Sequence, residues 1–297
     1  MAEQIRIIRN RIKSVNSTKQ ITRAMEMVAT SKIKKAQERI ESSRTYAVKM
    51  METMQDIAAR VSAAGQVSHP LLKQRESKKS AILAITSNRG LAGAFNTNII
   101  RRTEAMLKEK LAEDKELHLL MVGKKGINYF KFIGYEIAEE YNTISDKPTF
   151  EDAKEIADKL IELYSSAEID EAHVIFNHFK SVMDQKPMTY QVLPVPREIT
   201  SGGSAQSDVL FEPDAASILE TMLPNYVEIL IYRALLESAA SEHGARRTAM
   251  KAATDNAEDM ITGLIRVLNR ARQAQITKEL AEIVGGADAL KQASEAG

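Results

Sequence analysis

Cysteine and tryptophan are both absent from this 297-residue chain. Without cysteine, disulfides, thiolate metal sites and thiol switching are excluded. Aromatic residues make up only 5% of the chain, whereas hydrophobic residues as a whole make up 44%. The core must therefore be built mainly from Ala, Ile, Leu and Met, a composition that favours closely packed helices over a thick aromatic core.

Glycine and proline are missing from long stretches at both ends. Residues 1–60 contain neither, and residues 225–284 contain no proline and only two glycines, Gly244 and Gly263. An ordinary globular helix runs ~10–14 residues, whereas a helix of about 60 residues would be ~90 Å long. Helices of that length must lie against something, so we expect the two ends of the chain to pair with each other.

Long hydrophobic runs are also lacking. No apolar run approaches the ~20 residues needed to cross a bilayer. The N-terminal segment, MAEQIRIIRNRIKSV, lacks the continuous apolar region of a secretory signal peptide. It is basic and amphipathic like a transit peptide, but Glu3 and the helical pattern that continues past it argue against one. We expect a cytoplasmic protein of bacterial type.

The net charge is close to zero, at +1, but the charges are unevenly distributed. Residues 1–60 carry 13 Lys and Arg against 6 Asp and Glu, whereas residues 210–297 carry 9 against 13. A solvated basic face is the simpler interpretation of the first segment, and an acidic partner or a nucleic acid is the alternative. Because nucleic-acid binders usually add aromatic platforms, and the first aromatic residue here is Tyr46, we expect no nucleic-acid partner.

Hydrophobic spacing at both ends is that of a coiled coil. The first apolar residues step by 3 and 4, the a/d spacing of a heptad repeat. They are Ile5, Ile8, Ile12 and Val15. The stripe is then predicted to change phase and to resume at Ile21, Met25 and Val28, followed by Ile33, Ala36 and Ile40. The predicted C-terminal stripe is Met260, Leu264, Val267, Ala271 and Ala274.

The middle of the chain alternates strand-like and helix-like segments. Short apolar runs predict buried strands at 80–86, 117–123 and 172–179. Helices are predicted between and beside them, at about 94–113, 124–133 and 149–166. Strand and helix in alternation predict an α/β fold, a parallel sheet covered by helices in a Rossmann-like central domain.

The borders of this domain are less regular. Residues 187–196, PMTYQVLPVP, predict an edge strand, because proline cannot donate to a sheet ladder. Residues 69–79 and 201–208 are predicted to be polar connections to the terminal helices. The predicted domains are an N-terminal coiled-coil helix (1–60), a central α/β domain with its connections (61–208) and a C-terminal coiled-coil helix (209–297).

One loop has the position of a nucleotide-binding loop. SNRGLAGAFNTN (87–98) follows a predicted strand and opens a helix, but it contains neither G-x-G-x-x-G nor G-x-x-x-x-G-K-[ST]. We interpret Gly90 and Gly93 as permitting a tight turn, with an NAD or ATP site as the weaker alternative. The five histidines show no metal-ligand spacing, and no carboxylate pair stands out as an acid and a base. We expect no metal, no cofactor and no catalytic residue in this chain.

Four segments together match one known family. They are IRNRIKSVNSTKQITRAMEMVATSKIKKAQ (8–37), SNRGLAGAFNTN (87–98), ARRTAMKAATDNAEDMI (245–261) and NRARQAQITKELAEIVGGADAL (269–290). In this order they resemble the N-terminal helix, the central signature and the C-terminal helix of the gamma subunits of F-type ATP synthases. The match extends over essentially the whole chain.

The resemblance implies a rotor subunit that is not itself catalytic. In that family the terminal helices form a long antiparallel, left-handed coiled coil inside an α3β3 hexamer. The α/β domain lies below it, with the epsilon subunit and the membrane c-ring. Torque passes between the proton-driven c-ring and the catalytic β subunits. The implied location is peripheral, on the cytoplasmic side of the cell inner or plasma membrane, with membrane association only through the complex.

The resemblance also implies four contacts with the β subunit. Met25 matches the methionine of the family's I-T-[KR]-A-M-E-M segment, and Arg246 matches the arginine of its SEQAAR segment. Gln273 and Thr277 match the glutamine and threonine of ARQAxIT. The alternative for Met25 and Thr277 is ordinary helix packing, and the alternative for Arg246 and Gln273 is a solvated helix face.

Two departures from the family pattern matter, and the second, the missing insertion, excludes redox control by thiol exchange and favours a bacterial enzyme. Ala92 stands where many relatives have cysteine, and the plant-type regulatory insertion with its cysteine pair is missing between residues 176 and 212. Two other functions compete with the rotor. A free-standing α/β enzyme with helical extensions is opposed by the lack of a phosphate loop. A coiled-coil nucleic-acid binder is opposed by the acidic C-terminal helix.

Overall fold

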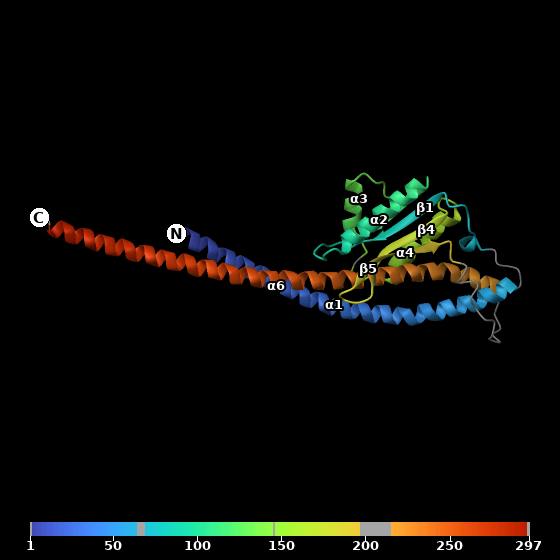
Figure 1. The fold of residues 1–297 in the computed structure, drawn as a ribbon. Coiled ribbons are helices and arrows are strands. Elements are labelled where there is room, and N and C mark those ends of the chain that lie inside the picture. The colour runs from blue at the N-terminus through green and yellow to red at the C-terminus, as the bar shows by residue number, and fades with distance from the viewer. Residues whose placement is uncertain (1, 64–68, 145, 197–214, 296–297) are drawn as a thin grey trace. The chain divides into compact units, whose positions relative to one another are not determined.

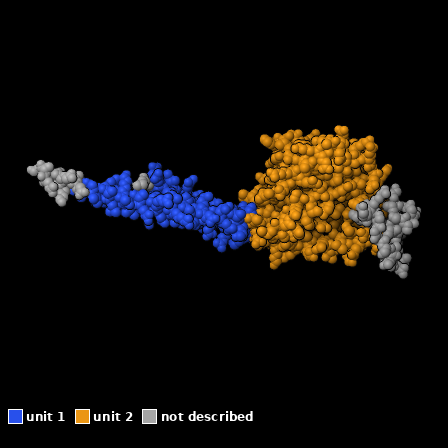
Figure 2. All heavy atoms as spheres, in the orientation of Figure 1, with its two compact units in different colours: residues 1–28, 249–297 blue, residues 29–248 orange. Residues whose placement is uncertain are grey.

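A computed structural model describes residues 2–63, 69–144, 146–196 and 215–295 of the chain. Contacts divide the chain into two compact units, coloured separately in Figure 2. The terminal unit comprises Met1–Val28 and Ala249–Gly297, and the α/β unit comprises Ala29–Thr248. Each unit includes a part of two long helices, α1 (Ala2–Ala63) and α6 (Ala215–Glu295). The division of the sequence into three domains at residues 60 and 208 stays a prediction.

The α/β unit is built on a five-stranded sheet (Figure 1). Its strands are β1 (Lys79–Ile85), β2 (Glu116–Val122), β3 (Glu139–Tyr141), β4 (Glu171–Phe179) and β5 (Gln185–Leu193). Their spatial order is β3-β2-β1-β4-β5, with β1 to β4 parallel and β5 antiparallel to β4. The strand order reverses next to β1, which is the topology of a Rossmann-like, doubly wound sheet.

Helices cover both faces of this sheet (Figure 1). On one face lie α2 (Phe95–Ala112) and α3 (Lys124–Phe132), and on the other lies α4 (Phe150–Ser165) with segments of α1 and α6. Alternate residues of β1 supply the two cores: Leu83 belongs to the cluster with α4, and Ile82 belongs to the cluster with α2. Burial on both faces explains why β1 reads as a continuous apolar run.

The predicted strands and helices of this unit are confirmed, with boundaries that differ by one or two residues. The edge strand is confirmed as well, and Pro187 in β5 lies opposite Asn177 of β4. The polar connection predicted at 69–79 is wrong at its start. Leu71 and Leu72 are buried in a short 3-10 helix, η1 (Pro70–Leu72), where two apolar neighbours reach the core. The connection predicted at 201–208 lies outside the described residues.

In the terminal unit the two helices run antiparallel. The Thr22 and Thr254 Oγ1 atoms lie 2.8 Å apart, and Lys19 Nζ lies 3.1 Å from Glu258 Oε1. From Thr22 to Lys19 the numbering of α1 falls by three, whereas from Thr254 to Glu258 the numbering of α6 rises by four, so the two helices run in opposite directions. This pairing confirms the predicted packing of the two ends against each other.

A heptad repeat of buried and half-buried residues continues along α1 with alternating steps of 4 and 3. We call these residues the seam of α1. It comprises Ile5, Ile8, Ile12, Val15, Lys19, Thr22, Glu26, Ala29, Ile33, Ala36, Ile40, Ser43, Ala47, Met50, Met54 and Ile57. The seam of α6 in the terminal unit comprises Met250, Thr254, Ala257, Ile261, Leu264, Leu268, Ala271 and Gln275.

The phase shift predicted in α1 is wrong. Ile21 is 60% exposed and Val28 is 57% exposed, because the repeat stays in register through polar and small residues. The C-terminal stripe was predicted only partly correctly, since Leu264 and Ala271 lie in the seam but Met260 and Val267 are more than half exposed. Ala274 is exposed too. The Thr22 and Thr254 hydroxyls can be buried because they hydrogen-bond to each other. A pattern of apolar residues alone therefore does not reveal these seam positions.

Among the described residues, no helix combines the length and the hydropathy needed to cross a bilayer. The terminal helices are long because they pack along a seam. In the terminal unit most residues outside the seam are exposed.

Two glycines provide a test of the packing between β1 and α3. Gly123 has a φ of 91°, and a Cβ added there would lie 2.3 Å from the Thr86 carbonyl oxygen. Gly134 has a φ of 85° with nothing within 4 Å. Left-handed strain should cost each alanine variant about 1–2 kcal/mol. The free energy of unfolding should fall at least about twice as much in Gly123→Ala as in Gly134→Ala, because the Thr86 backbone must also move in the first variant.

Urea unfolding of the two purified variants, followed by far-UV circular dichroism, measures this difference. Gly134→Ala is the matched control for strain without steric conflict. Equal losses in the two variants would show that the close approach of Thr86 to Gly123 does not contribute.

Candidate functional site

The segment after β1 is fixed by side-chain bonds at the carboxyl edge of the sheet. Thr86 Oγ1 accepts the Gly126 N–H at 3.0 Å, and Asn88 Oδ1 accepts the Lys124 N–H at 2.9 Å. The Ser87 carbonyl accepts the Lys125 N–H at 3.1 Å. These are the amides of the first turn of α3 that would otherwise be available to a phosphate. These bonds tie the start of the 87–98 loop to the first turn of α3.

The turn itself differs in detail from the sequence prediction. Gly93 adopts a positive φ of 54°, as a tight turn requires. The other left-handed residue is Leu91, with a φ of 61°, and Gly90 is not among the residues of positive φ. A Cβ on Gly90 would meet only the Lys125 side chain, at 3.7 Å. Gly93 is therefore the glycine that this turn requires.

A cavity of about 380 Å³ lies at this edge of the sheet. Ser87 and Asn88 border it from the end of β1, and Leu235 and Glu242 border it from α6. Open α/β sheets bind ligands outside the carboxyl ends of their strands, where the strand order reverses. Here α6 forms one wall at that place, so the edge of the sheet is an attachment point for this helix.

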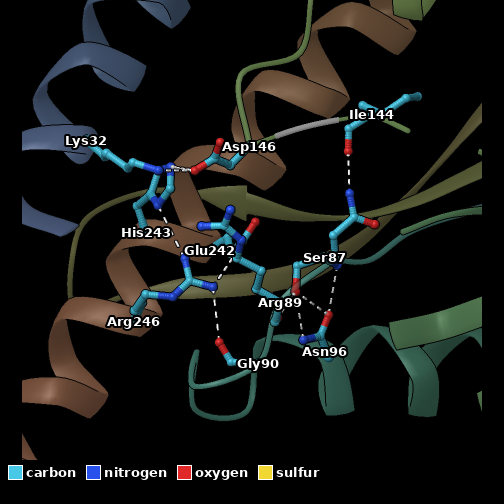
Figure 3. Close-up of polar contacts among 11 residues, drawn as sticks. Lys32, Ser87, Arg89, Gly90, Asn96, Ile144, Asp146, Glu242, His243 and Arg246 are labelled. Carbon is cyan, nitrogen blue, oxygen red and sulfur yellow. Dashed lines mark hydrogen bonds and ion pairs between the residues drawn. The ribbon is translucent and has the colours of Figure 1, made fainter. Parts of the chain in front are cut away.

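Arg246 connects α6 to the loop after β1 (Figure 3). Its Nη2 atom lies 2.6 Å from Glu242 Oε1 and donates to the Gly90 carbonyl at 3.2 Å. The side chains of Arg246 and Glu242 are only 11% and 9% exposed. Burial raises the pKa of the Glu242 carboxyl, although the charge and hydrogen bond of Arg246 oppose the shift. The Glu242 carboxyl therefore depends on Arg246 to stay ionised.

A second cluster lies beside it and consists of Lys32, Asp146 and His243, here called the Asp146 cluster (Figure 3). Lys32 Nζ of α1 donates to Asp146 Oδ2, and His243 Nε2 of α6 lies 3.8 Å from the same oxygen. Burial lowers the pKa of His243 to about 4; Asp146 opposes this shift, and the positive charges of Lys32 and Arg246 add to it. Burial would raise the pKa of Asp146, but the hydrogen bond and charge of Lys32 outweigh it and lower that pKa.

The four residues implied by the family resemblance take different environments. Arg246 is buried against its own unit, so the solvated-face alternative is wrong for this residue. Met25 is half-buried on α1, next to the seam residue Glu26. Gln273 and Thr277 are exposed one turn apart on α6, where Thr277 Oγ1 donates to the Gln273 carbonyl at 3.0 Å. Their contacts with the β subunit stay predictions.

Sequence reasoning missed the Asp146 cluster entirely. Lys32 was part of a charged helix face, Asp146 lay in an unassigned segment, and His243 was one of five unremarkable histidines. Lys32 and Asp146 are 114 residues apart, and no spacing rule joins them. Within the described residues no group of His, Asp and Glu could hold a metal ion.

Comparison with known proteins gives one consistent family. A family model described as ATP synthase matches residues 4–290. The chain is 46% identical over 287 residues to the ATP synthase gamma chain of Anaeromyxobacter sp. strain Fw109-5, covering 97% of this chain and 99% of that relative. It is 44% identical over 286 residues to the gamma chain of Staphylococcus epidermidis strain RP62A, covering 96% and 98%.

Solved structures agree with these relatives. A chain of the central stalk and c-ring of the Tetrahymena thermophila mitochondrial ATP synthase has a TM-score of 0.60 and 27% identity, covering 78% of this chain and 99% of that one. A chain of the Euglena gracilis mitochondrial ATP synthase, in rotational state 3, has a TM-score of 0.66 over 98% of this chain and 95% of that one. At 19% identity, the second likeness shows the fold alone.

The Arg246–Glu242 pair predicts a pH-dependent loss of stability. Removing one partner of a buried pair costs about 3 kcal/mol, so Arg246→Ala should lower the free energy of unfolding by about that much at pH 8. An acid with a raised folded-state pKa favours the folded state at low pH and loses that contribution as the pH rises through the folded pKa. Without Arg246 the Glu242 pKa rises further, so the loss should be smaller at pH 5.

Urea unfolding at pH 5 and pH 8 measures the two losses. The double variant Arg246→Ala/Glu242→Gln is the control, because it removes the titrating carboxyl and should lose equal stability at both pH values. A pH-independent loss in the single variant would show that Glu242 is not the group that Arg246 keeps charged.

Proposed function

The chain belongs to the ATP synthase gamma-chain family and is a central-stalk subunit of a rotary ATP synthase, and we propose that its terminal unit transmits torque to the catalytic β subunits. Its assembly partners are the α and β subunits and the c-ring. We include the epsilon subunit among the proposed partners. The central stalk couples proton movement to ATP synthesis by turning inside the stator.

The observation that carries this proposal is an apolar face on α6 that no other described part of the chain covers. The last half-buried residue of the α6 seam is Gln275, and residues 276–287 are all exposed. Ile276, Leu280 and Ile283 are 49%, 57% and 68% exposed and recur at steps of 4 and 3. These residues form one helix face, as amphipathic helices do where they meet a partner.

The register of the terminal unit explains why α1 does not cover this face. The Thr22–Thr254 and Lys19–Glu258 contacts place the start of α1 opposite about residue 275 of α6. Residues of α6 beyond that point extend past the end of α1. Transfer of each large apolar side chain out of water contributes about 1.5–3 kcal/mol, so a surrounding apolar collar of stator subunits would hold this end in place.

Torque transmission follows from the seam and from its asymmetry. The interlocked seam residues of the two helices resist sliding of one helix past the other. An asymmetric pair of helices presents a different surface to each of three equivalent β subunits. Each β subunit has conformational states that differ in nucleotide affinity. If the helix pair binds one of these states with a lower free energy than another, it shifts that subunit towards the favoured state and so changes its nucleotide affinity.

We assign the contacts with the β subunit to the four residues named from the family resemblance: Met25, Arg246, Gln273 and Thr277. The exposure of Gln273 and Thr277 supports their assignment. Met25 is half-exposed and available to a partner. Arg246 also bonds Glu242 and Gly90, so in addition to its proposed contact with the β subunit it holds the 87–98 loop to α6.

The subunit belongs to an enzyme complex, and we propose that it forms no bond with nucleotide itself. The absence of both nucleotide-loop motifs from residues 87–98 supports this. Association with the membrane is peripheral and occurs through the complex. We place it on the cytoplasmic side of the bacterial plasma membrane.

Truncation tests the proposed role of the exposed face. Removing the residues after Val267 deletes part of the α6 seam and the whole exposed face, so ATP-driven proton pumping per ATP hydrolysed should fall. Truncation after Val284 keeps that face and is the matched control, with coupling near the full-length value. Pumping and hydrolysis are measured on the same membrane vesicles, after confirming that α and β subunits co-purify with the chain. Unchanged pumping after the longer truncation would contradict the proposal.

Substitution of Met25 tests the second contact. Lysine at this half-buried position can extend its ammonium group to the surface, where it would pair with a β carboxylate and bias one rotor position. Met25→Lys should therefore lower the protons pumped per ATP, whereas Met25→Leu, which preserves the apolar volume, should not. If both variants pump equally per ATP, Met25 does not contact the β subunit.

A further inference from the structure

Asp146 lies in the segment between β3 and α4 and contacts two long helices at once. Its carboxylate accepts a hydrogen bond from Lys32 of α1 and faces His243 Nε2 of α6 at 3.8 Å (Figure 3). All three residues belong to the α/β unit. One carboxylate thus joins the sheet-bearing part of the unit to both helices.

The segment that carries Asp146 is itself anchored on both sides. Before it, the Ile144 carbonyl accepts the Asn88 Nδ2–H at 2.7 Å. After it, Thr149 caps α4: its Oγ1 accepts the Asp152 N–H at 3.2 Å, and the Asp152 carboxylate accepts the Thr149 N–H at 2.7 Å. Because these bonds fix the segment to the loop after β1 and to the start of α4, a force on the Asp146 carboxylate is passed to the sheet.

The apolar core that both helices share with the sheet lies farther along α1 than Lys32, at Met50 and Met54. Met50 and Met54 of α1 and Leu235 of α6 belong to the same core cluster as Leu83 of β1. Hydrophobic burial of this kind is non-directional, and flexible methionines adapt to small rotations. A charge-assisted hydrogen bond has a preferred geometry, and that of Lys32 with Asp146 is one-third exposed or less on each side, at 31% and 27%.

The charges around Asp146 favour its ionised form. Lys32 and Arg89 are cationic neighbours, and His243, with its lowered pKa, is neutral at pH 7. The nearest competing carboxylate, Glu242, is bonded to Arg246. The cluster therefore holds one anion between a cation on α1 and an imidazole on α6.

We propose that Asp146 is a positioning residue for coupling, which fixes the rotational setting of α1 and α6 against the α/β sheet so that torque on one is delivered to the other. This inference rests on the proposed function, since it concerns the same transmission of torque. In this proposal the Asp146 carboxylate is the group that sets both helices against the sheet, through Lys32 on α1 and His243 on α6.

The test uses the complete ATP synthase in membrane vesicles carrying Asp146→Asn, which keeps the shape and removes the charge. Protons pumped per ATP hydrolysed should fall clearly below the ratio of the unsubstituted complex. Asp146→Glu should recover most of the coupling, because the carboxylate remains. An unchanged ratio in Asp146→Asn would overturn the proposal.

Glu140→Gln is the matched control. It breaks the Lys131–Glu140 pair, a 2.6 Å contact of the same unit in which Glu140 is 30% exposed, close to the 27% of Asp146. That pair joins α3 to β3 and involves neither long helix. In Glu140→Gln, coupling should stay at the level of the unsubstituted complex. A drop as large as that in Asp146→Asn would mean that losing any ion pair of the unit lowers coupling, and this would also overturn the proposal.

Lys32→Met gives a second route, because it breaks the same contact from α1 and keeps Asp146 and its segment intact. It should lower the pumping ratio as Asp146→Asn does, and the double variant should be no worse than either single one. A normal ratio in Lys32→Met refutes the inference even if Asp146→Asn fails to assemble. Normal pumping after truncation at Val267 would instead refute the proposed function, so the two failures are distinguishable.

Discussion

The heptad repeat of α1 is the constraint on which the rest of the structure depends. Seam residues recur with steps of 3 and 4 from Ile5 to Ile57 without a change of phase. A stripe that narrow and that long needs a partner helix along its length, and a glycine or proline within it would loosen or break the helix. The scarcity of both residues at the ends of the chain follows from this. Two polar residues of the α1 seam have polar partners on α6: Thr22 pairs with Thr254, and Lys19 pairs with Glu258.

Stability and orientation come from different interactions in the α/β unit. Two apolar clusters, one on each face of the sheet, hold the helices against it. The polar contacts of Arg246 and Asp146 are few, but each joins elements that are far apart in the sequence, such as α6 with the loop after β1. Burial makes these contacts costly to break. They restrict how the elements are set against one another more than they add to net stability.

Much of this fold could be predicted from the sequence because its strands are buried on both faces. Such strands are continuous apolar runs, and β1, β2 and β4 were found within two residues. β3 was missed because it has only three residues, two of them glutamates. The heptad phase was misread because Lys19 and Thr22 occupy seam positions, whereas apolar Ile21 is exposed. Hydrophobicity alone does not distinguish a seam from a flank.

The candidate site was less predictable. Family segments pointed to Met25, Arg246, Gln273 and Thr277, but their partners inside the chain were invisible to spacing rules. The bond of Arg246 to the Gly90 carbonyl joins residues 156 apart. Asp146 and Lys32 meet only because β3, α4 and α1 are folded against one another. Contacts of this kind are set by tertiary structure, so a single sequence without its fold does not reveal them.

The uncovered end of α6 also has a consequence for the life of the subunit before assembly. Residues 276–287 are exposed in the part of the chain that the structure describes, and most helical stability in proteins comes from the packing of an amphipathic face. Segments with few buried contacts open at little cost in free energy and are cut first by proteases. We therefore expect this end of α6 to be cut readily by proteases until a partner subunit covers it.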